Sequence, residues 1–338
     1  MIYVGSYSSQ GGPGIAVATV RARVLTLHAT AADCPDDPTF LALAPDGRTL
    51  YAAHGLPQGL VSAFAVGDGG SLRLLGTQHT GGAQPIHLSV HSSGRYVLAA
   101  NWGSGSIVVH PVNGDGALGP ATDVVANPAR HAHMIVTDPA GRWVLAVHLG
   151  AGTVSTYHLD LESGRLRLQS QLHLHHGAGP RHLAFHPQGT TVYVVNELDS
   201  TVTVCGYDPD SGRLELGETV RTVASDTPVD NYPSAVLVSP DGRFVYVANR
   251  FVGERGRDCV GVLATEPSLR LVATYPCGHF PRDMAFTDGG RLLYVANERA
   301  DVVEGLAVDP ADGSLRPAGV TLAVLRPTCV LPVRERQW

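Results

Sequence analysis

The chain has 338 residues, of which 44% are hydrophobic and 16% are charged, and its formal net charge is −6 at pH 7. This composition favours a large buried core and excludes an intrinsically disordered chain. Every basic residue is Arg, which excludes lysine-based catalysis, and the sequence lacks the basic stripe with interleaved aromatic residues that is typical of nucleic-acid binding.

The chain begins with MIYVGSY, which is typical of a β-strand and turn and lacks the features of a signal peptide. No apolar run approaches the length of a membrane span. The five cysteines form no C-x-x-C pair, and their odd number argues against a disulfide framework. We therefore expect a cytoplasmic protein that binds neither membranes nor nucleic acid.

Six similar segments follow in chain order, each with an apolar run, a turn containing Gly and a second apolar run: LALAPDGRTLYAAH, LSVHSSGRYVLAAN, MIVTDPAGRWVLAVH, LAFHPQGTTVYVVN, VLVSPDGRFVYVAN and MAFTDGGRLLYVAN. Their shared glycines recur at spacings of 47, 47, 48, 53 and 48 residues: Gly47, Gly94, Gly141, Gly189, Gly242 and Gly290. Each segment predicts a β-hairpin. The extra residues before Gly242 are expected in a longer loop around Asp226 to Asn231.

Further apolar runs such as SIVVHPV and TVTVCGYD, and tight turns such as Asp208 to Leu214, predict a third and a fourth strand after each hairpin. Four short strands in about 48 residues are typical of one β-propeller blade. The C-terminal segment from Pro327 to Val330 matches the first strand of a copy, and MIYVGSY matches the second. We therefore predict an all-β, seven-bladed β-propeller of four antiparallel strands per blade. It would form a single domain over residues 1–338, with one blade shared by the two termini.

In such a hairpin the start of the first strand lies beside the end of the second, close to the central channel. The positions eight residues before the shared glycines, with the matching C-terminal position, hold Thr39, Ile86, His133, Arg181, Ser234, Arg282 and Thr328. The positions seven residues after them hold His54, Asn101, His148, Asn196, Asn249 and Asn297. The next positions hold Gly55, Trp102, Leu149, Glu197, Arg250 and Glu298.

Charged residues at these positions are expected to gather on one face near one axis. Arg is suited to bidentate binding of carboxylate or phosphate, Glu can activate water, and His can donate a proton to a leaving oxygen. The pairs Arg181–Glu197 and Arg282–Glu298 also fit simple cross-strand ion pairs, which would stabilise the fold without catalysis. The recurring Asn is interpreted mainly as scaffold that bonds turn backbone.

Several motifs resemble the seven-bladed lactonase family: His131-Ala132-His133, Gly177 to Phe185 (GAGPRHLAF), Val194 to Leu198 (VVNEL) and Tyr246 to Arg250 (YVANR). This family includes bacterial 6-phosphogluconolactonase and fungal carboxy-cis,cis-muconate cyclase, and the resemblance extends from MIYVGSY to PTCVLPV. It implies a hydrolase of carbohydrate metabolism, a 6-phosphogluconolactonase of the pentose phosphate pathway. Where the family often has Asp-Leu-Gly-Ala-Asp, this chain has His148-Leu149-Gly150-Ala151-Gly152.

The resemblance assigns the catalytic positions to His133, Arg181, Glu197 and Arg250. The expected substrate-binding residues are His87, Asn101, His182, Asn196, Arg282 and Glu298. Arg181 and Arg250 would stabilise the oxyanion, Glu197 would activate water, and His133 would protonate the leaving ring oxygen. We expect a small anionic or sugar lactone as substrate, no cofactor, no metal, and a monomer or weak homo-oligomer.

Two other functions stay open. The same arginines suit a muconate-type cyclase or isomerase acting on an unsaturated dicarboxylate, and propellers also serve as non-enzymatic ligand- or protein-binding platforms. The stretch from His173 to His176 reads as an outer strand rather than a zinc site, because no Cys or acidic partner stands at ligand spacing. Arg255 and Arg257 would bind an anion or, as is more common, be solvated.

Overall fold

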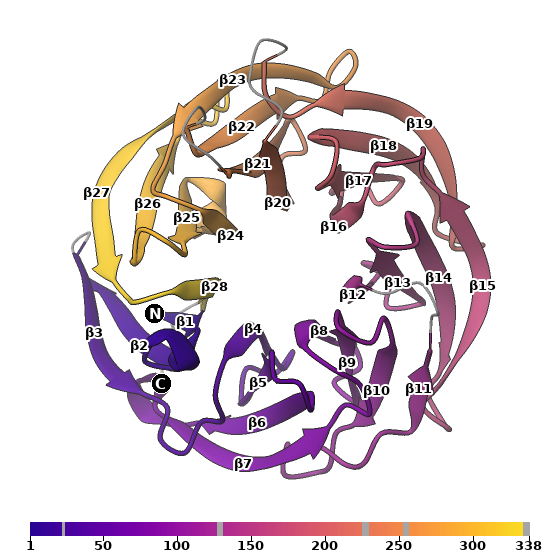
Figure 1. The fold of residues 1–338 in the computed structure, drawn as a ribbon, viewed down its shortest axis with the longest axis vertical. Coiled ribbons are helices and arrows are strands. Elements are labelled where there is room, and N and C mark those ends of the chain that lie inside the picture. The colour runs from indigo at the N-terminus through magenta and orange to yellow at the C-terminus, as the bar shows by residue number, and fades with distance from the viewer. Residues whose placement is uncertain (22–23, 127–130, 225–229, 253–256, 334–338) are drawn as a thin grey trace.

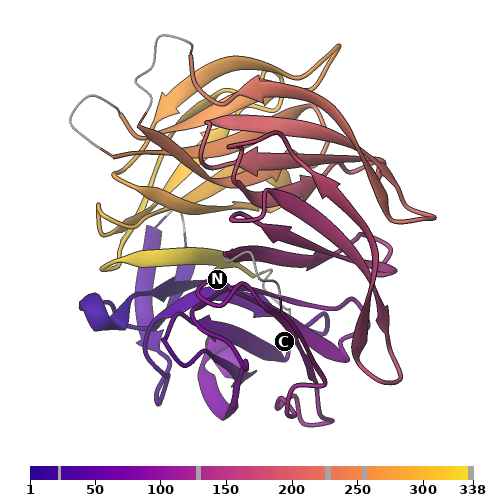
Figure 2. The same ribbon diagram turned by 45° about the vertical axis from the view of Figure 1, so that its right-hand side comes forward.

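The computed structural model describes residues 1–21, 24–126, 131–224, 230–252 and 257–333. Within these ranges, seven four-stranded antiparallel sheets are arranged in a ring (Figure 1). The turned view shows the sheets stacked side by side around the ring as twisted blades (Figure 2). This architecture confirms the predicted seven-bladed β-propeller.

In every blade the first strand is the innermost and the fourth is the outermost (Figure 1). Blade 1 contains β4 (Pro38–Leu43), β5 (Thr49–His54), β6 (Leu60–Val66) and β7 (Leu72–His79). Blade 2 contains β8 (Pro85–Val90), β9 (Tyr96–Asn101), β10 (Ile107–Pro111) and β11 (Asp123–Val125). Blade 3 contains β12 (Ala132–Thr137), β13 (Trp143–His148), β14 (Thr153–Asp160) and β15 (Arg165–His173). Blade 4 contains β16 (Pro180–Phe185), β17 (Thr191–Asn196), β18 (Thr201–Asp208) and β19 (Arg213–Arg221).

Blade 5 contains β20 (Asn231–Val238), β21 (Phe244–Phe251), β22 (Cys259–Ala264) and β23 (Arg270–Pro276). Blade 6 contains β24 (Pro281–Thr287), β25 (Leu292–Asn297), β26 (Val302–Val308) and β27 (Leu315–Ala323). Blade 7 contains β28 (Pro327–Pro332), β1 (Ile2–Ser6), β2 (Ile15–Arg21) and β3 (Val24–Thr30). The helices of the described ranges are short 3₁₀ turns: η1 (Ser8–Gln10), η2 (Asp68–Gly70) and η3 (Asp288–Gly290). None of them is long and apolar enough to cross a membrane.

The shared glycines lie in the turns between the first and second strands of each blade. All six have positive φ, from 67° at Gly141 to 86° at Gly290, a region that favours glycine because it lacks a Cβ atom. The glycines therefore recur in the sequence because each turn requires a residue with positive φ. The longer loop predicted around Asp226 to Asn231 lies largely outside the described residues, and Asn231 already begins β20.

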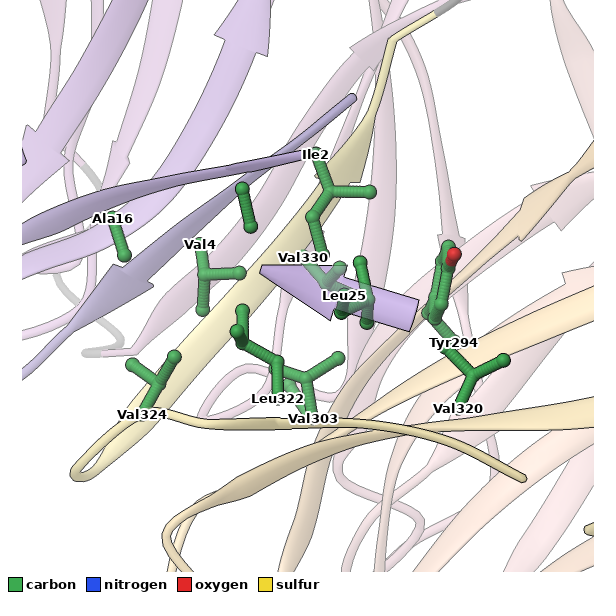
Figure 3. Packing of buried hydrophobic residues seen from close by; sticks show 12 residues of the cluster. Ile2, Val4, Ala16, Leu25, Tyr294, Val303, Val320, Leu322, Val324 and Val330 are labelled. Carbon is green, nitrogen blue, oxygen red and sulfur yellow. The ribbon is translucent and has the colours of Figure 1, made fainter. Parts of the chain in front are cut away.

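The two termini build blade 7 together, as predicted. Strand β28 pairs antiparallel with β1, with Val330 opposite Val4. Val330, Ile2 and Val4 point toward the side chains of Tyr294 and its neighbours in blade 6, and this cluster is almost fully buried (Figure 3). The C-terminal strand therefore closes the ring and occupies an edge of β1 that would otherwise be exposed.

Aromatic residues near the start of the second strands join neighbouring blades. The Tyr51 hydroxyl donates to the carbonyl of Gly116, and the Tyr246 hydroxyl donates to that of Gly313, each with an oxygen–oxygen distance of 3.0 Å. In blade 3 the Trp143 indole N–H donates to the carbonyl of Pro209. Each bond links one blade to the turn between the third and fourth strands of the next. The aromatic rings are therefore buried between neighbouring blades, while their hydroxyl or N–H groups form hydrogen bonds across the interface.

A β-bulge interrupts the pairing of the first and second strands in every blade. The unpaired residues include Thr39, Ile86, His133, Arg181, Ser234, Arg282 and Thr328, which are the residues eight positions before the shared glycines and their C-terminal equivalent. Bulges redirect a side chain and commonly lie beside active sites. The chain therefore presents one reoriented side chain from each blade near the common axis.

Candidate active site

A pocket of about 410 Å³ lies where the bulges meet. Its lining residues come from all seven blades and their connections: Tyr7, Gln10, Asp37, Thr39, Gly55, Gln84, Ile86, Trp102, His133, Arg181, Glu197, Arg250 and Arg282. The four predicted catalytic residues therefore share one pocket with Arg282. Both predicted cross-strand ion pairs, Arg181–Glu197 and Arg282–Glu298, also form.

Glu197 lies at the centre of a cluster that we call the Glu197 triad, formed by Arg181, Glu197 and Arg250. Its Oε2 is 2.9 Å from Nε of Arg181 and 3.0 Å from Nη2 of Arg250. The Glu197 backbone N–H donates to the carbonyl of Gly179, which fixes the chain directly after β17. One carboxylate is thus shared by guanidinium groups from two adjacent blades.

Backbone carbonyls hold both arginines of the triad in place. Nη1 of Arg181 donates to the carbonyl of Ser234, and Nε of Arg250 donates to that of Tyr232. Burial lowers the pKa of both guanidinium groups, and the charge of Glu197 opposes this effect. Two arginines against one carboxylate leave the triad with a net positive charge. It is therefore suited to attract an anion or to stabilise a developing oxyanion.

His133 projects from the bulge of β12 into the same pocket. Burial and the nearby charge of Arg181 lower its pKa well below the usual value, so the imidazole is neutral. Its Nδ1 is buried without a partner among the described residues, which favours the tautomer with the proton on Nε2. A neutral ring donates a hydrogen bond but does not supply the readily transferred proton that the sequence-based mechanism assigned to His133.

His87 and His182 do not line the pocket but pack beneath it. The His182 ring centroid is 5.1 Å from that of His133 and 5.5 Å from that of His87. The Phe40 ring is tilted against that of His87, with centroids 4.1 Å apart. Burial lowers the pKa of both histidines, that of His87 to about 3. The rings therefore form an uncharged layer under the pocket. The described part of the chain contains no group of His, Cys, Asp or Glu side chains suited to hold a metal ion.

The structure places Asn101 and Asn196 outside the pocket lining, fully buried at the ends of β9 and β17. The Asn101 side chain donates to Ser106 Oγ, and that of Asn196 donates to the hydroxyls of Thr201 and Thr203. Both asparagines therefore fasten the second strand to the third, which agrees with the scaffold interpretation and not with their assignment as substrate-binding residues.

Arg282 lines the pocket, whereas the predicted binding residue Glu298 lies behind it. Glu298 contacts Arg282 through Oε2 at 3.2 Å and Arg326 through Oε1 at 3.0 Å. We call Arg282, Glu298 and Arg326 the Glu298 triad. Sequence reasoning missed Arg326.

A second set of residues lies two positions before the bulges, and the conformation that they share was not predicted from the sequence. These residues have positive φ in six blades: Asp37, Gln84, His131, Gly179, Phe280 and Arg326. Only blade 4 uses glycine, although five bulkier side chains adopt the same uncommon conformation. Asp37 and Gln84 line the pocket, and Phe280 stacks on Arg250 with its ring centroid 5.0 Å from Cζ. The signal in the sequence is the proline that follows five of these six residues and begins the first strand.

The remaining candidates that the structure describes do not line the pocket. His173 ends the outer strand β15, and His175 pairs with Asp199 on the surface. Arg257 is exposed, and Arg255 lies outside the described residues.

Comparisons with known proteins agree with the fold. A family model described as "Lactonase, 7-bladed beta-propeller" matches residues 1–332. The chain is 31% identical to 6-phosphogluconolactonase of Bacillus subtilis, with 97% of each chain covered. It is 29% identical to 6-phosphogluconolactonase of Pectobacterium carotovorum, with 87% of each covered. Among solved structures, the periplasmic gluconolactonase PpgL of Pseudomonas aeruginosa superposes with a TM-score of 0.89 at 27% identity, covering 98% of both chains.

Proposed function

The chain belongs to the seven-bladed β-propeller lactonase family and is a lactonase, and we propose that it hydrolyses 6-phosphogluconolactone in the pocket of the Glu197 triad. The observation that carries this proposal is the position of Glu197. Its carboxylate is 21% exposed in a pocket where the two arginines that hold it are only 3% and 7% exposed. Within the triad, the side chain most accessible to water is therefore a fixed carboxylate.

In the proposed mechanism, Glu197 accepts a proton from water as the water oxygen attacks the lactone carbonyl carbon. Arg181 and Arg250 stabilise the resulting oxyanion, because each retains a guanidinium nitrogen without a partner among the described residues. The bond from the carbonyl carbon to the ring oxygen then breaks. The Glu197 carboxyl returns its proton to that oxygen, which becomes the hydroxyl of the open-chain acid.

His133 has a supporting role in this mechanism. As a neutral imidazole with its proton on Nε2, it would donate a hydrogen bond to the departing ring oxygen. Its low pKa keeps it uncharged beside three arginines, so it does not add to the repulsion among them. The proton that crosses from water to the ring oxygen is thus carried by Glu197 alone.

Replacing Glu197 with Gln tests the mechanism. We expect kcat to fall by about 100- to 10,000-fold, because the amide cannot accept the proton from water. Steady-state hydrolysis of 6-phosphogluconolactone measures the effect, and circular dichroism checks the fold. The control is Asp199→Asn, which removes a carboxylate two residues away that does not line the pocket. Unchanged turnover in Glu197→Gln would remove Glu197 from the mechanism.

A substrate panel separates this function from the alternatives. The muconate-type cyclase predicts activity on an unsaturated dicarboxylate, and the non-enzymatic platform predicts no turnover of any lactone. We further propose that the protein acts in the cytoplasm as a monomer or weak homo-oligomer, without nucleic acid or membrane. The net charge of −6 supports the lack of nucleic-acid binding.

A further inference from the structure

The Glu298 triad repeats the design of the Glu197 triad two blades further along the ring. In each, an arginine at a first-strand bulge precedes by 16 residues a glutamate that follows the second strand. In each, a second arginine from the next blade also contacts the carboxylate: Arg250 in the first triad and Arg326 in the second. The two triads therefore have the same composition and the same formal charge.

Their exposure, however, is opposite. In the Glu197 triad the carboxylate is 21% exposed and the arginines are 3% and 7% exposed. In the Glu298 triad the carboxylate is 6% exposed, whereas Arg282 is 17% and Arg326 is 27% exposed. The first triad thus presents a carboxylate to the solvent, and the second presents guanidinium groups.

Arg282 has free bonding capacity toward the pocket. Only its Nη1 has a hydrogen-bond partner in the described chain, which is Glu298 Oε2. The Tyr7 ring, another part of the pocket lining, lies 5.3 Å from its Cζ atom. Nε and Nη2 are therefore available as a two-pronged donor, the arrangement with which Arg binds phosphate and carboxylate groups.

Glu298 and Arg326 would keep that donor in position. Both Glu298 oxygens are occupied by guanidinium groups, and its backbone N–H donates to the carbonyl of Phe280. A buried carboxylate with all of these contacts fixes the orientation of Arg282 in the way that a supporting residue fixes a ligand-binding group. The charge of Glu197 also acts on Arg282, which places the two within electrostatic range of each other.

We propose that Arg282, oriented by Glu298 and Arg326, binds the phosphate monoester of the substrate while the lactone carbonyl lies at the Glu197 triad. Arg282 would thus determine the preference for a phosphorylated over a neutral sugar lactone. This inference rests on the proposed function for the position of the reacting carbonyl, but the phosphate subsite itself does not depend on turnover.

The test compares 6-phosphogluconolactone with unphosphorylated glucono-lactone. In Arg282→Gln, we expect kcat/KM for the phosphorylated substrate to fall by about 10- to 100-fold, because charge-assisted bonds to the phosphate are lost. The value for the neutral lactone should change by less than about threefold. The matched control, Arg299→Gln, removes the same charge from an exposed residue that stacks on Phe280 outside the pocket lining, and it should leave both values unchanged. Equal losses on both substrates, or no loss on either, would overturn the assignment.

Titration calorimetry with inorganic phosphate supplies a measurement that needs no catalysis. The unmodified protein should bind phosphate, and Arg282→Gln should not. If that variant loses its native circular dichroism spectrum, Arg282→Lys replaces it, with weakened phosphate binding expected because the forked donor is lost. Failure of the unmodified protein to bind phosphate would overturn the subsite. Phosphate binding through Arg282 in a protein that hydrolyses neither lactone would instead overturn the proposed function and keep the subsite.

Discussion

At the scale of single residues, burial controls the charge of the histidines beneath the pocket. His87 is fully enclosed, and its pKa in the folded protein is lowered from 6.5 to about 3. In the unfolded chain the same imidazole takes up a proton near pH 6.5. Protons therefore bind preferentially to the unfolded state in this window, and the folded state loses stability as the pH falls from about 6.5 toward 3.

Replacing His87 with Phe should reduce this pH dependence. At about pH 4.5 the difference in protonation of His87 costs roughly 3 kcal/mol, at about 1.4 kcal/mol per pKa unit. Urea unfolding between about pH 8 and pH 4.5 should therefore show a shallower loss of stability in the variant than in the unmodified protein. The control, His176→Phe, removes an exposed imidazole and should keep the original slope. Parallel slopes for the His87 variant and the unmodified protein would contradict the assignment.

At the scale of structural elements, the end of the second strand is fastened to the third by a side chain that differs between blades. In blade 4, Asn196 donates to the hydroxyl of Thr201, which stands opposite it, and to that of Thr203. Blade 3 has His148 at this place, opposite Thr153. Both His148 ring nitrogens and the Thr153 hydroxyl are buried without partners within the described chain.

We expect His148→Asn to stabilise the protein by about 1 kcal/mol, because the amide would bond Thr153 and remove unsatisfied buried groups. The loss of a buried imidazole whose pKa is lowered to about 4 should also reduce destabilisation in acid. The midpoint of urea unfolding measures the effect. The reverse change, Asn196→His, breaks a satisfied contact in blade 4 and should destabilise. A lower midpoint for His148→Asn would contradict this account.

The same comparison of blades explains which parts of the structure were predictable. The spacing of the shared glycines reflects a positive-φ requirement that recurs in every hairpin, so it predicted the blades and their closure. The positions eight residues before these glycines predicted Arg181 and Arg282 as residues that turn toward the axis. The sequence could not distinguish their roles, because Glu197 and Glu298 occupy identical repeat positions and differ in exposure and in which oxygens contact the arginines. The repeat positions of Asn101 and Asn196 also predicted that they lie at the channel, but their side chains form hydrogen bonds to residues just before the third strand or within it.

Arg326 illustrates the limit of the repeat. It lies two positions before a bulge, in a conformation that five other blades share, but its equivalents are as different as Asp37, Gln84 and Phe280. Because the side chains at this position vary, the only common signal in the sequence is the proline that follows most of them, and a proline does not indicate the role of the residue before it. The contact between Arg326 and Glu298 became evident only in the structure, where the closed ring places the segment before β28 beside Glu298.

At the scale of the whole molecule, β28 connects the two blades on either side of the closure. The Thr328 hydroxyl donates to the carbonyl of Pro38 in blade 1, and the Val330 backbone N–H donates to Asp283 in blade 6. Burial raises the pKa of the Asp283 carboxyl to about 6. The hydrogen bond from the Val330 N–H opposes this effect, because it stabilises the charged form of the carboxyl. A strand at the end of the chain therefore supports two blades that are distant in sequence.

A chain that ends after Arg326 lacks this strand, and we expect it to lose the cooperative unfolding transition of the complete protein. The truncation exposes the edge of β1, uncovers the apolar cluster around Tyr294 and removes the Val330 N–H that donates to Asp283. An open strand edge next to exposed apolar surface promotes association between chains. Thermal denaturation followed by circular dichroism should show a broadened or absent transition, and light scattering should show concentration-dependent association. Addition of a peptide spanning residues 327–333 should restore the transition, because the missing strand pairs through backbone bonds that a separate chain can supply. A truncated chain that stays monomeric and melts like the complete protein would show that the other six blades hold the ring together without β28.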